Sequence, residues 1–247
     1  DTDVLTGGSK TNVYDFSGYG GSVTAFYAGD GFDDGELGYT QQFIGAGKAT
    51  DAVTASYTSA DDTVVINMQA VATFNLSVGN GSALNANFAK VTGLKEINFT
   101  DNSAESVTFS ALDLGTTVDI TSTNNTQVTV VPSDATGSAD TLSVKAKAAA
   151  ADNKVLKLVV ADVETVAVKA DSANQVDLDV SGVTMTAVGA TAGLTITGSN
   201  DIEITADNAD ITSINAATNT GGVIQTVRAA TGVFTATGGT GSDTFRM

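Results

Sequence analysis

Short runs in which apolar and polar residues alternate recur along most of this chain. Each run is about four to seven residues long, and polar turns containing Gly, Asn and Asp separate them. Alternation with a period of two is typical of half-buried β-strands, and helical spacing is nearly absent. Only KAKAAAADNK (145–154) has a helix-like composition, and a loop is an equal alternative there. We therefore predict an all-β fold with strands at 63–68, 72–78, 96–99, 106–109, 117–121, 127–131, 141–146, 155–160, 164–170, 175–180, 193–198 and 201–206.

Two observations favour a solenoid for these strands. Aromatic residues make up only 6% of the chain, whereas the core of a β-sandwich normally contains large aromatic anchors. The segment GLKEINFTDNSAESVTF (93–109) resembles ADVETVAVKADSANQVDL (161–178), as expected of stacked repeating units. We predict a right-handed parallel β-solenoid or β-roll, with β-sandwich modules as the alternative.

The run QVDLDV (175–180) gives the expected register of one strand. Because successive strand side chains point to opposite faces, Val176, Leu178 and Val180 should face the interior. The intervening polar residues, Gln175, Asp177 and Asp179, should then face outward.

Composition excludes several classes of function. The chain has 247 residues, 42% of them hydrophobic, which is enough for a sizeable core. Its 28 acidic and 11 basic residues give a net charge of −17, which would repel nucleic acids and anionic membrane surfaces. No run of about 18 apolar residues occurs, so no membrane insertion is expected. Cations are the expected partners.

The sequence contains few of the residue types that catalytic sites commonly use. Histidine and cysteine are absent, which removes Ser-His-Asp triads, Cys-His pairs and zinc-water sites. A carbohydrate-active enzyme on a β-solenoid remains as a minor alternative, because Asp/Glu pairs, Ca²⁺ and Arg228 could carry out such chemistry. Sugar-cleaving clefts usually contain tryptophan or clustered tyrosine, which the strand region lacks. We therefore expect that this protein is not an enzyme.

The C-terminal segment GGTGSDTFR (238–246) matches the nonapeptide G-G-x-G-x-D-x-U-x, where U is a large apolar residue. Gly238, Gly239 and Gly241 are expected to allow tight turns with positive φ and to direct carbonyl oxygens inward. Asp243 adds a hard anionic oxygen, and Phe245 begins a strand that fills the interior. Ca²⁺ takes six or more oxygens, so a neighbouring coil must supply the remaining ligands.

The N-terminal segment repeats this pattern imperfectly. Asp3 and Leu5 match the sixth and eighth positions of one nonapeptide, and GGSKTNVYD (7–15) matches the next with Lys10 and Asn12 at two key positions. We interpret the second copy as a decayed turn that keeps the fold without binding calcium strongly.

A glycine-rich acidic loop, AGDGFDDGELG (28–38), is a further candidate calcium site. It contains Asp30, Asp33, Asp34 and Glu36. Its spacing differs from that of an EF-hand loop, which has a central Gly and a terminal Glu at fixed offsets. A site here would need ligands from elsewhere, and a solvated acidic loop is the alternative.

These glycine-aspartate nonapeptides resemble the calcium-binding repeats-in-toxin (RTX) family, whose repeats wind into parallel β-rolls. The Thr/Ala/Val-rich segments 139–198 and 211–245 resemble the long β modules of RTX-type surface-layer proteins of Gram-negative bacteria. The resemblance covers about residues 90–247. It implies a degenerate RTX-like start (1–62), a β-solenoid module (63–237) and the start of a nonapeptide turn (238–247), within one continuous domain of a longer protein.

The same resemblance implies a function. The chain would be a structural module of a secreted, calcium-dependent surface-layer protein that self-assembles into a lattice at the cell surface. Export would follow type I secretion, without a cleaved leader. The expected partners are copies of the chain and cell-surface polysaccharide, and Ca²⁺ is the expected cofactor. A segment of a large RTX adhesin or biofilm matrix protein is the alternative.

Overall fold

The computed structural model describes most of the chain, and its strands extend from residue 13 to residue 245. The described residues are 13–21, 23–27, 42–57, 62–79, 83–101, 106–122, 126–148, 155–172, 174–185, 193–205, 208–225 and 234–246.

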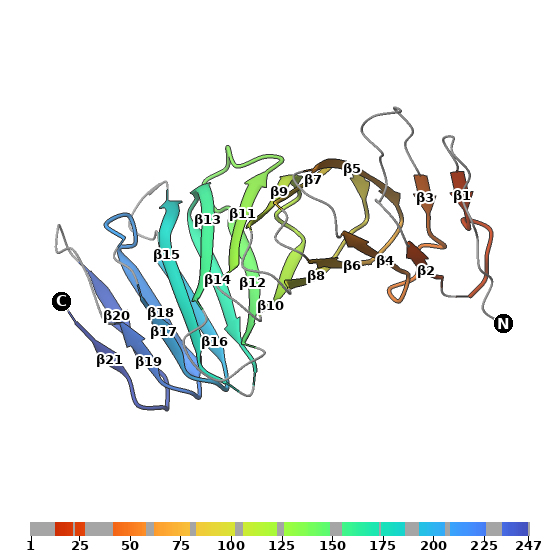
Figure 1. Cartoon of the computed structure of the whole chain (residues 1–247). Coiled ribbons are helices and arrows are strands. Elements are labelled where there is room, and N and C mark those ends of the chain that lie inside the picture. Colours follow the sequence, from red (N-terminus) through yellow and green to blue (C-terminus); the bar gives the residue numbers. More distant parts are fainter. Residues whose placement is uncertain are drawn as a thin grey trace.

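The strands of this described part form two parallel sheets (Figure 1). Sheet A has 11 strands in the order β1 (Val13–Asp15), β3 (Gln42–Ile44), β5 (Asp62–Gln69), β7 (Leu84–Thr92), β9 (Ser106–Leu112), β11 (Thr126–Pro132), β13 (Val155–Val163), β15 (Val176–Met185), β17 (Ile202–Ile204), β19 (Val223–Gln225) and β21 (Thr244–Phe245). Sheet B has 10 strands in the order β2 (Thr24–Tyr27), β4 (Ala52–Tyr57), β6 (Thr73–Val78), β8 (Glu96–Asp101), β10 (Thr117–Ser122), β12 (Thr141–Ala148), β14 (Thr165–Ala170), β16 (Gly193–Gly198), β18 (Ser213–Asn219) and β20 (Thr235–Thr237).

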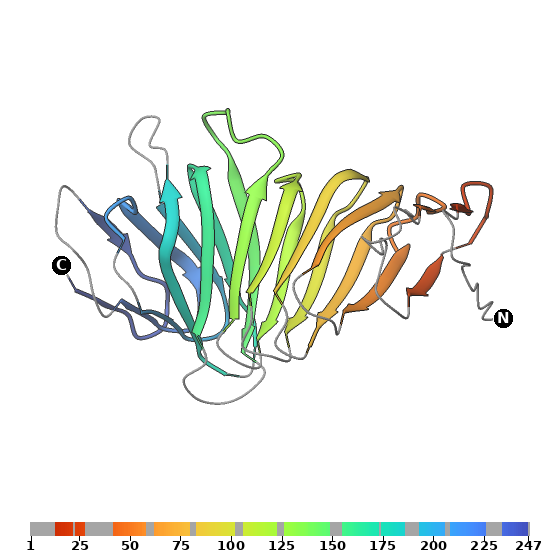
Figure 2. The same ribbon diagram turned by 45° about the horizontal axis from the view of Figure 1, so that its top comes forward.

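Consecutive strands alternate between the two sheets, so the chain winds as a coil that contributes one strand to each sheet per turn. All the described strand pairs are parallel. The coils stack along one long axis, with β1 and β21 at opposite ends of the stack (Figures 1 and 2). This confirms the predicted β-solenoid. It excludes the sandwich, whose sheets are antiparallel.

Alternating side chains build the interior that the two sheets enclose. In β12, inward and outward residues alternate along the whole strand. In sheet B, one inward column consists of fully buried aliphatic residues in register, Ile97, Val118, Val144, Val168 and Ile196. Burying each such side chain stabilises the fold by about 1.5–3 kcal/mol. Each coil covers the apolar face of the next. Part of the core also contains buried phenylalanines that pack edge to face, Phe74 on Phe88, Phe88 on Phe109 and Phe109 on Phe99.

The predicted strands agree closely with the structure. Each predicted run from 63–68 to 201–206 overlaps a strand, and β15 has the predicted register, with Val176, Leu178 and Val180 at 3%, 0% and 1% exposure. Asp177 and Asp179 are half-buried on the outer face. The stretch with helix-like composition begins as part of β12, and its residues 149–154 lie outside the described residues.

Strands β4 and β18 lie outside the predicted runs, and between β5 and β17 strand β7 (Leu84–Thr92) was not predicted. Its inward residues Leu84, Ala86 and Phe88 alternate with the outward Asn85 and Asn87, but asparagine and alanine have low β-propensity. Pairing with β5 and β9 on its two sides holds it in sheet A. Tertiary pairing therefore overrides a weak local preference.

Candidate functional site

The nonapeptide forms the corner between the last two described strands. Residues 238–243 connect β20 in sheet B to β21 in sheet A. In β21, Phe245 is partly buried and packs against the core, as the motif predicts for its large apolar position. Near the other end, Tyr14 occupies the same motif position, lies in β1 and stacks on Phe43 with ring centroids 5.3 Å apart.

Asp243 joins this corner to the coil before it. Its Oδ1 atom accepts a hydrogen bond of 3.0 Å from the backbone nitrogen of Val223. Asp201 lies in the coil before that of Val223, and its Oδ1 atom accepts a hydrogen bond of 2.7 Å from the backbone nitrogen of Gly222. Two carboxylates from different coils thus satisfy adjacent N–H groups of the middle coil. Hydrogen bonds to ionised acceptors are about twice as strong as neutral ones.

The positive φ predicted for the three glycines of the motif is wrong. Among the described glycines, positive φ occurs at Gly47, Gly93 and Gly198. Close approach between coils is the reason for glycine instead. A Cβ atom on Gly239 would overlap the carbonyl oxygen of Asn219, and one on Gly241 would overlap that of Gly221. A Cβ atom on Gly238 would overlap the Asp243 carboxylate.

Carboxylates join coils at other corners as well. Asp51, only 1% exposed, accepts hydrogen bonds from the backbone nitrogens of Val23 at 2.8 Å and Lys48 at 2.9 Å. Glu164, 5% exposed, accepts one from the backbone nitrogen of Asp140 at 2.6 Å.

Asp51, Glu164 and Asp201 were not predicted as site residues, although the sequence contains a usable signal. Asp51, Glu164, Asp201 and Asp243 each directly precede a strand. An acidic residue immediately before an alternating run is therefore a pattern to search for in solenoids of this kind.

The remaining predicted calcium ligands, Asp3, Asp30, Asp33, Asp34 and Glu36, lie outside the described residues. Within the part of the chain that the structure describes, no group of three or more Asp or Glu side chains is arranged to hold a metal ion. A cation at the C-terminal corner would therefore need backbone or amide oxygens beside Asp243.

Two buried amide oxygens without a partner lie on the coil next to this corner. Asn219 is fully buried, and its Nδ2 atom donates to the Gly221 carbonyl oxygen at 3.1 Å while its Oδ1 atom has no hydrogen-bond partner. Gln225 is 6% exposed, and its Oε1 atom also has no partner. Gln225 lies in register with Ile204 and Phe245, so the interior of this coil is more polar than that of its neighbours.

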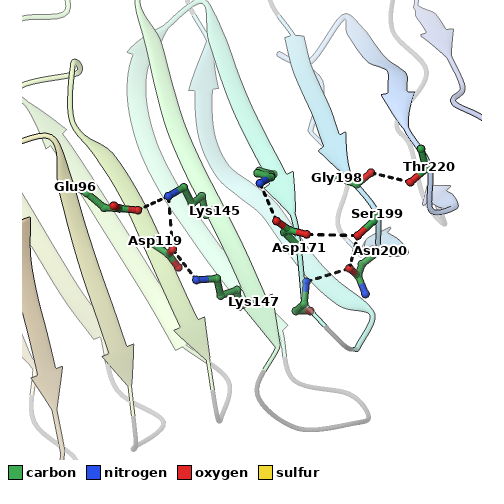
Figure 3. A network of polar contacts seen from close by, with 11 residues as sticks. Glu96, Asp119, Lys145, Lys147, Asp171, Gly198, Ser199, Asn200 and Thr220 are labelled. Carbon is green, nitrogen blue, oxygen red and sulfur yellow. Dashed lines mark hydrogen bonds and ion pairs between the residues drawn. The ribbon is translucent and has the colours of Figure 1, made fainter.

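The outer face of sheet B carries a network of charged side chains (Figure 3). Lys145 forms ion pairs with Glu96 and, at 3.9 Å, with Asp119, and Lys147 pairs with Asp119 at 2.7 Å. The hydrogen bond to Glu96 raises the pKa of Lys145 despite its partial desolvation. The Asp119 side chain is only 7% exposed beneath the two lysines.

On the outer face of sheet B, hydrogen-bonded amide side chains continue this network toward the N-terminal coils. Asn98 Nδ2 donates to Asn75 Oδ1 at 2.8 Å, and Asn75 Nδ2 donates to Thr54 Oγ1 at 3.1 Å. Asn75, Asn98, Asp119 and Lys145 occupy one register position on successive strands. The face is thus polar and internally hydrogen-bonded.

Comparisons with known proteins give no further assignment: no protein-family model, curated protein or solved structure matches the chain. In its described residues there is also no helix with the length and hydrophobicity needed to cross a membrane.

Proposed function

We propose that this chain is a structural module of a secreted, calcium-dependent surface-layer protein that assembles with copies of itself. One observation carries the proposal: a complete nonapeptide forms a solenoid corner, and its Asp243 carboxylate is half-buried against the neighbouring coil. The stacked parallel sheets with polar outer faces are suited to a structural role, and the fold supports a lattice module over an adhesin built from sandwich repeats.

Calcium would be held at this corner by Asp243 together with oxygens of the surrounding turn. The second carboxylate oxygen of Asp243, backbone carbonyls of residues 238–241 and the buried Asn219 amide oxygen are suitable hard ligands. The close packing of Gly239 and Gly241 on the preceding coil brings carbonyl groups of two coils together.

The proposed effect of calcium is neutralisation of charge. A module with a net charge of −17 repels copies of itself, and divalent cations on its carboxylates lower that repulsion while adding bonds between coils. Calcium binding to the folded state alone also raises its stability, by about 2.7 kcal/mol per site at a concentration 100 times Kd.

A calcium titration of the purified chain tests the proposal. Light scattering and negative-stain electron microscopy should show association and ordered arrays at millimolar Ca²⁺, reversed by EGTA. Equal concentrations of Mg²⁺ should be much less effective, because Mg²⁺ requires a smaller octahedral shell and dehydrates reluctantly. Identical scattering and melting curves in Ca²⁺ and in EGTA would contradict the proposal.

A further inference from the structure

We draw no further inference here: the strongest candidate, the groove of about 340 Å³ between the end of β7, which extends past its pairing with β9, and the corner that joins β9 to β10, carries none because nothing in the structure shows what covers it.

Discussion

The Oδ1 atom of Asp243 lies 3.0 Å from the backbone nitrogen of Val223, which belongs to the preceding coil. The carboxylate therefore has a structural role that does not require a metal. An asparagine at this position keeps an oxygen that can accept the same hydrogen bond, whereas an alanine does not. The two substitutions separate the structural role from a role in calcium binding.

We predict that Asp243→Ala lowers stability in EGTA by about 1–3 kcal/mol, because the Val223 N–H loses its acceptor. Asp243→Asn should lower the stability in EGTA much less, because its amide oxygen can accept the same hydrogen bond. Both variants should show a smaller rise in melting temperature on adding Ca²⁺ and should shift the midpoint of assembly to higher Ca²⁺ concentration. A full calcium response in Asp243→Asn would mean that Asp243 acts only as a structural acceptor.

The register of β15 provides a test of the solenoid interior. Leu178 is fully buried and Asp177, its neighbour, is half-buried on the outer face. Leu178→Asp should lower the free energy of unfolding by roughly 3–5 kcal/mol, because it places an unpaired carboxylate in the core. Asp177→Ser should change it by less than about 1 kcal/mol. Equal losses in urea denaturation would contradict the assigned register.

Alternation of residues was sufficient to predict most strands, because inward and outward positions depend only on local sequence. Contacts between coils were not predictable in the same way. The corner hydrogen bonds join residues 28 positions apart at Asp51 and Val23, 24 at Glu164 and Asp140, and 20 at Asp243 and Val223. Because coil length varies, the sequence alone does not show which residues meet at a corner.

The glycines of the nonapeptide also depend on contacts between coils that the sequence does not predict. The motif correctly predicted a turn followed by a strand containing Phe245. Its local sequence suggested positive φ for the glycines, but Gly239 and Gly241 are held close to the preceding coil and have no positive φ. The requirement for glycine comes from a contact between coils, which only the stacked structure reveals.

Substituting these glycines should loosen the last described coil. In Gly241→Ala, the new Cβ atom meets the carbonyl group of Gly221, and relief of this overlap should cost about 1–3 kcal/mol. Because a terminal coil can open without the others, hydrogen exchange at the Val223 and Phe245 amides is the suitable measurement. Gly79→Ala is the control, since no atom lies within 4 Å of its added Cβ. Unchanged exchange in Gly241→Ala would show that the coils are not packed this closely.

The ion pair at the end of β14 predicts a measurable pKa. Asp171 Oδ2 lies 2.7 Å from Lys169 Nζ, and Ser199 Oγ donates to Asp171 Oδ1 at 3.4 Å. The hydrogen bond and charge of Lys169 are the main causes that lower the pKa of Asp171, and Ser199 and the charge of Lys147 add smaller effects. Since the lowered pKa belongs to the folded state, this carboxylate stabilises the fold above its unfolded pKa of about 3.9, and the contribution disappears as the pH falls through the folded value.

We therefore expect Lys169→Gln to raise the pKa of Asp171 toward its ordinary value and Ser199→Ala to raise it less. NMR titration of the Asp171 carboxyl carbon measures both shifts directly. Asp134 is an internal control, because its lowered pKa arises from hydrogen bonds to Thr136, in another turn, and should not change in either variant. Because Asp171 and Lys169 are both well exposed, the effect of each variant on overall stability should be small. If Lys169→Gln leaves the titration of Asp171 unchanged, the ion pair does not persist in solution, and Lys169 is then free to bind another group on the outer face of sheet B.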